Sequence, residues 1–402
     1  MNTFDVGVVG AGVAGAFACL KLAKDHKSLK VIAFDIGRPP AKRRRQTEGW
    51  LGCFPNSDGK LYSNDLNKVS AIVDNRKLKS AHQYFNSVLS NVGKFKIVKD
   101  KPVSISLDKK LKKLGYGIEY NDYTQTYPKD IHALSKYMAS EIDGNKNIQF
   151  SFDNEIMQIS KQKGMFVIQS QLGEYRCKKI VIAVGRSGWR WAKNLYKNFG
   201  IIDNNDSSRF GIRVELNEQY MKDFNKSSCT ISKGNIELGP LCWNGTVIPE
   251  DHIDLAISSF RSNENRWKTD KVSFNLIGNI NYPNQGCEQT DRLGQLTFVL
   301  TNERILKERV STFLNKKSMI SIMNEYSWLH DTVKDVSEFL PEILTKASFH
   351  VPTIIPMAPS INIGSNLETE VENMFVVGES AGIHGILSAA CMGIIVADTV
   401  SK

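Results

Sequence analysis

Residues 4–35 read FDVGVVGAGVAGAFACLKLAKDHKSLKVIAFD. The stretch opens on an apolar run typical of a strand and turns through a glycine-rich segment. It continues as an Ala-rich amphipathic segment that we expect to be helical to about His26, and a second apolar run covers Val31–Phe34. The acid Asp35 follows directly. This order of strand, glycine turn, helix, strand and acid predicts a βαβ unit that binds a dinucleotide.

The glycines and the acid each have a physical reason to be there. Gly10 makes the tight turn, Gly12 lets a pyrophosphate approach the backbone, and Gly15 lets the helix lie close to the strand. The helix N-terminus offers N–H groups to phosphates. Asp35 stands 20 residues after Gly15, where a carboxylate can accept hydrogen bonds from ribose hydroxyls. The alternative, a glycine-rich turn in an ordinary βαβ unit, explains fewer of these features.

Composition narrows the class of protein. The 402 residues suffice for two or three domains, with 41% hydrophobic and 23% charged residues, as in ordinary globular proteins. No apolar run approaches the roughly 18–20 residues that cross a bilayer. The chain starts on a core strand without a basic stretch, so we expect no secretory signal. Seven cysteines without a C-x-x-C pair predict reduced thiols in the cytoplasm and neither a disulfide framework nor a metal site.

The net charge of +10 is compatible with a nucleic-acid partner or an anionic substrate. The lysines are scattered, however, and basic residues do not alternate with aromatic ones, so a solvated basic surface is the favoured interpretation. The one dense cluster, Lys42–Arg45, follows the strand that ends in an acid. We expect at least one of its arginines to reach back to the cofactor, and a cluster facing solvent is the alternative.

Further along the chain, the patterns predict a sheet with a long insertion. The expected elements are a loop over 36–62, helices over 66–100 and Asp130–Ile142, short strands over 103–127, a strand at Ile148–Phe152, a hairpin of Glu155–Ser160 with Gly164–Gln169, a buried parallel strand at Ile180–Val184, helices around Glu303–Leu314 and Lys317–Tyr326, a strand at Met374–Val377 and a helix over Ile386–Val400. We expect nucleotide-binding parts at 1–75, 76–189 (with a helical and β insertion) and 351–402, and a substrate domain at 190–350.

The C-terminal segment favours FAD over a nicotinamide cofactor. A glycine fingerprint serves both, but FAD is longer, and its flavin half needs a second holding point. Here the strand Met374–Val377 ends in Gly378-Glu379, and a glycine-rich start precedes the last helix. A carboxylate there can accept ribityl hydroxyls. The helix N-terminus can present N–H groups to the N1–O2 edge of the flavin.

On these motifs the chain resembles the bacterial FAD-dependent dehydrogenases of glutathione-reductase-like fold, over nearly its whole length. That resemblance implies an α/β protein with a discontinuous Rossmann-like FAD-binding domain and an inserted β-rich α+β substrate domain. It is carried by Val6–Asp35, Gly49–Leu61 (GWLGCFPNSDGKL), Ile180–Trp191 (a strand, G-R-S-G and a Trp), Phe210–Glu215 (FGIRVE) with Leu241–Val247 (LCWNGTV), and Asn366–Gly393.

Carried over position by position, the resemblance implies a set of FAD contacts. Two departures, a bulkier Leu51–Asn56 and Glu379 in place of the usual Asp, suggest a specialised relative. The implied contacts are Gly10, Gly12, Gly15, Asp35, Arg43, Gly52, Ser57, Ile156 (backbone to adenine), Ala183, Gly185, Gly378, Glu379, Gly385 and Ile386.

Fewer residues are candidates for a catalytic role than for cofactor contacts, because a flavin itself carries the electrons. Lys60 is a candidate to stabilise a reduced flavin anion or bind a substrate carboxylate, and an ion pair with a neighbouring acid such as Asp58 is the alternative. His384 is a candidate general acid or base, or a structural hydrogen-bonding residue. The candidates on the substrate side are Tyr62, Cys242 and Trp243.

These features predict a cytoplasmic FAD-dependent oxidoreductase. A hydride would pass between flavin N5 and a small or medium organic substrate of specialised metabolism. A flavin monooxygenase that uses NAD(P)H as a transient co-substrate is one alternative, although the chain has no second G-x-G-x-x-G. A flavin-containing protein that binds or modifies nucleic acid is the alternative from another class. The sequence does not indicate an oligomeric state.

Overall fold

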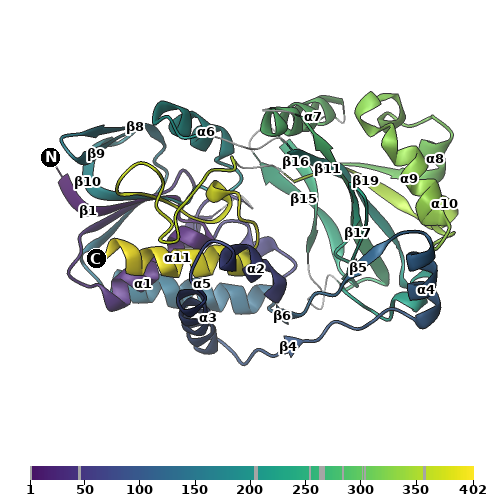
Figure 1. The fold of residues 1–402 in the computed structure, drawn as a ribbon, viewed down its shortest axis with the longest axis horizontal. Helices are drawn as coiled ribbons and strands as arrows, with labels where there is room; N and C mark the ends of the chain where they lie inside the picture. The colour runs from purple at the N-terminus through teal and green to yellow at the C-terminus, as the bar shows by residue number, and fades with distance from the viewer. Residues whose placement is uncertain are drawn as a thin grey trace.

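The chain folds around two hydrophobic cores, which form the two lobes of Figure 1. The computed structural model describes residues 2–43, 47–202, 207–252, 255–261, 268–282, 285–300, 302, 305–355 and 359–402. The first core combines residues from both ends of the chain, and the second core is built from its middle. Among the described residues, no helix has both the length and the apolar character needed to span a bilayer.

The first lobe is organised by a seven-stranded sheet whose parallel strands end at one edge. Because strands such as β2 are buried along their whole length, they can lie inside a sheet that is covered on both faces. The order is β7 (Ile148–Ser151), β2 (Val31–Phe34), β1 (Asn2–Val9), β10 (Gly173–Ile182), β9 (Met165–Ser170) and β8 (Ile156–Gln162), with β20 (Met374–Val376) parallel to the end of β10.

Helices α1 (Val13–Asp25) and α11 (Ile386–Val400), from opposite ends of the chain, pack against each other next to this sheet (Figure 1). They approach so closely that a Cβ on Gly393 would lie 2.1 Å from the carbonyl oxygen of Ala14. Only glycine permits that contact. The other helices of this lobe are α2 (Leu66–Ser70), α3 (Asn75–Ser90), α5 (Pro128–Asp143) and α6 (Trp189–Asn198).

The second lobe is built on an eight-stranded sheet with one apolar and one polar face. Along β11 (Ser207–Asn217), Phe210, Ile212 and Val214 enter the second core, as the period of two in a strand requires. The intervening Arg213 and Glu215 lie on the opposite face. The order is β18 (Leu306–Arg309), β19 (Ser348–Ile355), β11, β17 (Lys271–Asn281), β13 (Ile236–Leu238), β12 (Thr230–Lys233) and β5 (Gly117–Glu119), with β14 (Cys242–Trp243) on β17.

Smaller elements complete the two lobes. They are the three-stranded sheet of β3 (Lys60–Tyr62), β6 (Tyr123–Gln125) and β4 (Ile97–Val98), the hairpin β15 (Thr246–His252) with β16 (Leu255–Arg261), and helices α4 (Ile105–Lys113), α7 (Gly286–Leu300), α8 (Val310–Leu314), α9 (Trp328–Ser337) and α10 (Ile343–Lys346).

The predicted fold class, a discontinuous Rossmann-like α/β unit with a β-rich insertion, is confirmed. The expectation of only short strands over 103–127 is wrong, because α4 occupies Ile105–Lys113. Leu107 and Leu111 lie four residues apart and are both buried in the second core, while Ser104 caps the helix by accepting a hydrogen bond from the N–H of Leu107. Residues of α4 and β5 thus pack with the second lobe.

The helices expected around Glu303–Leu314 and Lys317–Tyr326 are also wrong in large part. Residues 303–304 lie outside the described residues, β18 then pairs with β19, and the helix is confined to Val310–Leu314. The second segment contains two 3-10 turns, Ile320–Ile322 and Asn324–Tyr326. The Ser318 hydroxyl accepts a hydrogen bond from the N–H of Ile320, and such local bonds compete with a continuous α-helix.

Candidate functional site

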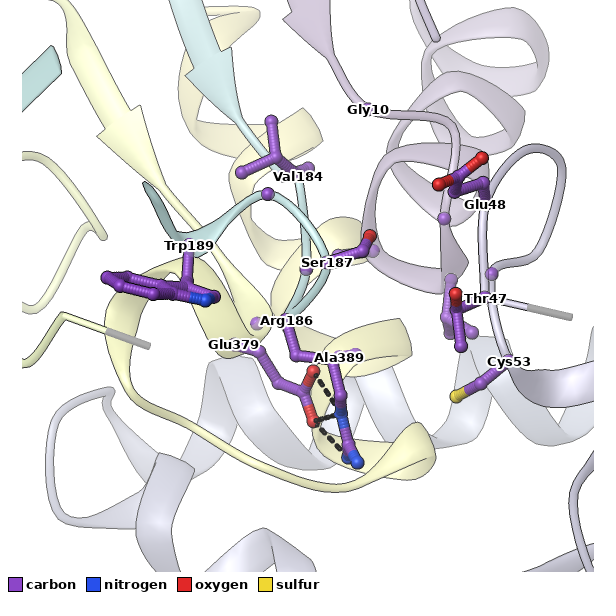
Figure 2. A pocket seen from close by; sticks show the side chains of 18 of the residues that line it. Gly10, Thr47, Glu48, Cys53, Val184, Arg186, Ser187, Trp189, Glu379 and Ala389 are labelled. Carbon is purple, nitrogen blue, oxygen red and sulfur yellow. Dashed lines mark hydrogen bonds and ion pairs between the residues drawn. The ribbon is translucent and has the colours of Figure 1, made fainter. Parts of the chain in front are cut away.

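A cavity of about 570 Å³ lies where β1, β2, β10 and β20 end, and Figure 2 shows part of its lining, including Gly10, Arg186 and Glu379. The cavity also reaches the polar face of the second sheet. Its volume is within the range of roughly 300–1,000 Å³ typical of ligand pockets. Its lining includes Asp35 and Ile156 from the first lobe and Arg213, Cys242 and Asn275 from the second sheet. In open parallel sheets, ligands bind at this carboxyl edge of the strands.

The three glycines of the first turn have different surroundings. A Cβ on Gly10 would lie 2.4 Å from the carbonyl oxygen of Ala183, and one on Gly15 would lie 1.8 Å from that of Gly10. At Gly12 the nearest atom to such a Cβ is 4.0 Å away. Gly12 also begins helix α1 without a side-chain cap, so the N–H groups of the first turn can bind an anion in the cavity.

Asp35 fixes the end of β2 against the glycine turn. Its carboxylate accepts hydrogen bonds from the N–H groups of Ala11 at 2.6 Å and Gly37 at 2.7 Å. Burial raises the pKa of this carboxyl, and the backbone N–H groups oppose that rise. A buried acceptor at this position on the cavity wall suits the hydroxyls of a ribose.

On the other side of the cavity, Glu379 forms a bidentate ion pair with Arg186 (Figure 2). The distances are 2.6 Å from Arg186 Nη2 to Oε1 and 3.0 Å from Nε to Oε2, and His384 Nδ1 lies 3.4 Å from Oε1. Burial alone would raise the pKa of Glu379, but Arg186 and His384 outweigh it and hold that pKa well below its usual range. Sequence reasoning named Glu379 and missed this partner. The signal was available, because Arg186 follows the neighbouring strand β10.

Helix α11 begins at the cavity on Gly385, which has φ of 109° and no side-chain cap. A Cβ there would lie 2.3 Å from Asp65 Oδ2, so this carboxyl sits directly against the helix start. Burial raises the pKa of Asp65 to about 7; Lys68 opposes the rise, and the acids Asp58, Glu119 and Glu379 add to it. Sequence reasoning missed Asp65, because nothing local indicates that it meets a helix some 320 residues away.

The structure brings most of the predicted cofactor residues to this one cavity. The bulky side chains of Leu51 and Phe54 point into the core and leave the backbone at Gly52 beside Gly12. The indole of Trp191 donates a hydrogen bond to the carbonyl of Ile156 at 2.7 Å. The predicted residues on the wall are Gly10, Gly12, Asp35, Gly52, Ser57, Ile156, Ala183, Gly185, Gly378, Glu379, Gly385 and Ile386.

Gly15 and Arg43 lie behind the wall. Arg43 donates hydrogen bonds to the carbonyls of Trp50, at 2.8 Å, and Gly52, and thereby holds the loop that carries Gly52. Burial lowers the pKa of Arg43, and the neighbouring Cys53 and Asp35 oppose that change. Arg44 and Arg45, the other arginines of the basic cluster, lie outside the described residues.

The residues predicted to act in catalysis or substrate binding do not gather at the cavity as the predicted cofactor residues do. Lys60 is buried behind the cavity, where its Nζ donates to Ser228 Oγ at 2.8 Å and to the carbonyl of Leu241 at 3.1 Å. Burial raises the pKa of Tyr62 well above its usual value. The indole of Trp243 donates to the carbonyl of Ser227 at 2.5 Å. Of the five candidates, Cys242 is the one that lines the cavity, and His384 reaches it through Glu379.

Several solved structures resemble the chain distantly. No protein-family model and no curated protein matches the chain. Solved structures that resemble it include glycine oxidase from Geobacillus kaustophilus (14% identity, 100% of this chain and 95% of that one, TM-score 0.46). Others are a variant of NikD, an amino acid oxidase of nikkomycin biosynthesis (12%, 100% and 94%, 0.43), and a variant of the halogenase PltM in complex with FAD (13%, 100% and 70%, 0.47). Similarity at this level is too low to transfer a function.

Proposed function

We propose that this chain is an FAD-dependent oxidoreductase acting on a small or medium organic substrate of specialised metabolism. The observation that carries the proposal is the convergence of both chain ends on one cavity. Gly12 and Asp35 come from the start of the chain, and Glu379 and the N-terminus of α11 come from its end. A nucleotide with two distant polar parts fits such a cavity.

Different residues would bind the different parts of FAD. Gly12 and the start of α1 would bind the pyrophosphate, Asp35 the adenosine ribose, and the backbone at Ile156 the adenine. Glu379 would accept ribityl hydroxyls, and the start of α11 would face the pyrimidine edge of the flavin. When bound, FAD would supply the two-electron chemistry. The second sheet would cover the reacting end and exclude water from it.

The test of the reaction class is anaerobic reduction of the FAD-loaded protein, followed by flavin absorbance. Reduction by organic substrates without NAD(P)H supports a dehydrogenase or oxidase. Reduction by NAD(P)H alone, with oxygen incorporated into a substrate afterwards, would replace the proposal with the monooxygenase alternative. Reduction by dithionite and by no biological donor would contradict an enzymatic role.

A further inference from the structure

A lysine-rich segment, residues 94–113, lies outside the cavity and runs along the lower margin of Figure 1, from the end of α3 through β4 to the end of α4. The structure describes all of these residues, and none of them lines the cavity. The segment contains eight lysines, two aspartates and no other charged residue. A twentieth of the chain therefore carries six of its ten net positive charges.

All eight lysines of the segment are exposed. On α4, Leu107 and Leu111 pack into the second core. Residues four apart lie on one face of a helix, so Ile105, Lys109 and Lys113 form a stripe that is turned away from that core. The fold thus presents the charge of α4 outward.

The acids nearby balance few of these lysines. Lys112 pairs with Asp108 at 2.7 Å, and Lys99 pairs with Asp122 at 2.5 Å. Asp100 is bound to backbone and hydroxyl donors of the second lobe. The lysines that form no ion pair with any described residue are Lys94, Lys96, Lys101, Lys109, Lys110 and Lys113. Such a group of uncompensated cations attracts an anionic partner.

Three aliphatic side chains are exposed among the lysines. Ile97 is 60%, Val98 38% and Ile105 76% exposed. Single exposed aliphatic residues are ordinary in proteins, but these three lie within nine residues. The chain from Ile97 to Ile105 spans at most about 28 Å, so one flat surface can contact all three. Lysines combined with exposed aliphatic side chains are typical of segments that bind at the surface of a membrane.

The same side chains suit a nucleic acid less well. Nucleic-acid surfaces use the planar fork of arginine for phosphates and exposed aromatic rings for stacking on bases. This segment contains no arginine. Its one aromatic residue, Phe95, is half-buried and packs against the first core. Exposed aliphatic side chains gain nothing from a phosphate backbone, whereas they gain from the acyl boundary of a bilayer.

We propose that residues 94–113 dock the protein on the surface of an anionic lipid bilayer. The lysines would lie among the phospholipid headgroups, and Ile97, Val98 and Ile105 would reach the boundary of the acyl chains. The protein would lie on one side of the bilayer and not span it. This inference is independent of the proposed function. For this segment it replaces the solvated basic surface that the scattered lysines of the sequence favoured.

The test is co-sedimentation of the 402-residue chain with lipid vesicles. One set of vesicles contains two parts phosphatidylcholine and one part phosphatidylserine, and the other contains phosphatidylcholine alone. At low ionic strength we expect a partition coefficient at least about tenfold higher on the anionic vesicles, because several lysines contribute. Most of this binding should be lost at about 0.5 M salt, where charges are screened within a few Å.

A combined variant tests the charge of α4. Lys109→Gln, Lys110→Gln and Lys113→Gln together should lower the partition coefficient on anionic vesicles at least tenfold, since one lysine at such a surface contributes roughly fivefold. All three side chains are exposed, so the unfolding temperature should stay that of wild type.

The matched control removes the same charge from the first lobe. Lys27→Gln, Lys163→Gln and Lys197→Gln, at three exposed lysines without an ion pair to any described residue, should together change the partition coefficient less than twofold.

Ile105→Ser tests the apolar contact at constant charge. It should weaken binding to the anionic vesicles at least threefold, because the aliphatic side chain no longer reaches the acyl boundary. Leu172→Ser is the control, since Leu172 is 65% exposed on a turn of the first lobe and should have no such effect.

The other occupants give different results. Equal partitioning on both kinds of vesicle, or an equal loss in the two lysine variants, would overturn the proposal, and no vesicle binding at all would leave a solvated surface. Transfer RNA or duplex DNA is titrated in parallel. Tighter binding to either than to anionic vesicles, unchanged in Ile105→Ser, would replace the bilayer by a nucleic acid. None of these outcomes bears on the binding of FAD.

Discussion

Gly12 and Gly15 stand three residues apart, yet an added methyl group would meet different surroundings at each. At Gly15 it would collide with the Gly10 carbonyl at 1.8 Å, whereas at Gly12 it would project into the cavity. Gly12 has φ of −62°, which any residue can adopt. The first glycine pattern of the chain therefore combines a packing requirement with a ligand requirement, and substitution can separate them.

We predict that Gly12→Val folds but loses FAD. The apo-protein should be destabilised by about 1 kcal/mol at most, the typical cost of a poor helix cap, while FAD affinity falls more than roughly tenfold. Gly15→Ala should instead cost about 1–3 kcal/mol of apo-protein stability through overpacking. Thermal unfolding and FAD titration of both variants measure the two effects. Wild-type FAD affinity in Gly12→Val would contradict the assignment of this glycine to the pyrophosphate.

The raised pKa of the Asp65 carboxyl predicts that the stability of the folded protein depends on pH. Its pKa of about 7 in the native state exceeds the unfolded value of 3.8, so the native state binds the proton more tightly. Stability should therefore fall as pH rises from about 4 to about 7 and stay at the lower level above that. Asp65→Asn should be more stable than wild type at pH 8, by about 2–4 kcal/mol, and equal to it near pH 4.

Chemical denaturation across this pH range measures the effect. Asp153→Asn, at a side chain that is 61% exposed, is the control and should show no comparable gain. A gain for Asp65→Asn that is the same at pH 4 and pH 8 would show that titration of Asp65 is not its cause.

Some of the residues at the candidate site could be predicted from the sequence, and others could not. Gly12, Asp35 and Glu379 could be selected because each lies within three residues of the end of a strand with a recognisable apolar run. Arg213 lies in a segment, FGIRVE, that drew attention only through a family resemblance. Its burial on the cavity wall arises from strand pairing between β11 and β17, whose paired residues lie 54 to 74 positions apart, and local pattern cannot show that.

At the scale of elements, helices α1 and α11 form one unit because both begin at the cavity and touch at Gly393. The bounds of α11 were predictable from its small, apolar residues and the glycine before it. Helix α4 was missed because its lysine-rich sequence places only Leu107 and Leu111 in the core. Strand β18 was missed because its pairing with β19 depends on a segment about 40 residues later.

We predict that Gly393→Ala separates the two helices. The added methyl group would meet the Ala14 carbonyl at 2.1 Å, so the protein should lose about 1–3 kcal/mol of stability and bind FAD more weakly. Gly144→Ala is the control, because Gly144 ends helix α5 with φ of −65° and its Cβ would have ordinary contacts of 3.4 Å and more. Equal unfolding temperatures for the two variants would contradict the close approach of α1 and α11.

At the scale of the whole molecule, the two ends of the chain share one sheet and one cavity. The parallel pairing of β1 with β10 and of β10 with β20 brings Gly10, Ala183 and Gly378 to the same edge. This arrangement could be predicted, since each end carries its own strand, glycine turn and helix. The polar face of the second sheet, which supplies the far wall, could not, because its strands pair across long stretches of chain.

The most direct test of this convergence is a comparison of FAD with its two halves. Calorimetry and thermal unfolding would measure the binding of FAD, FMN and ADP to the same apo-protein. We predict one FAD per chain, bound much more tightly than either half, and a stabilisation of about 2.7 kcal/mol at a hundredfold excess over the dissociation constant. A colourless protein that FAD does not stabilise, or one that binds ADP as tightly as FAD, would contradict the claim that both ends of the chain hold a single cofactor.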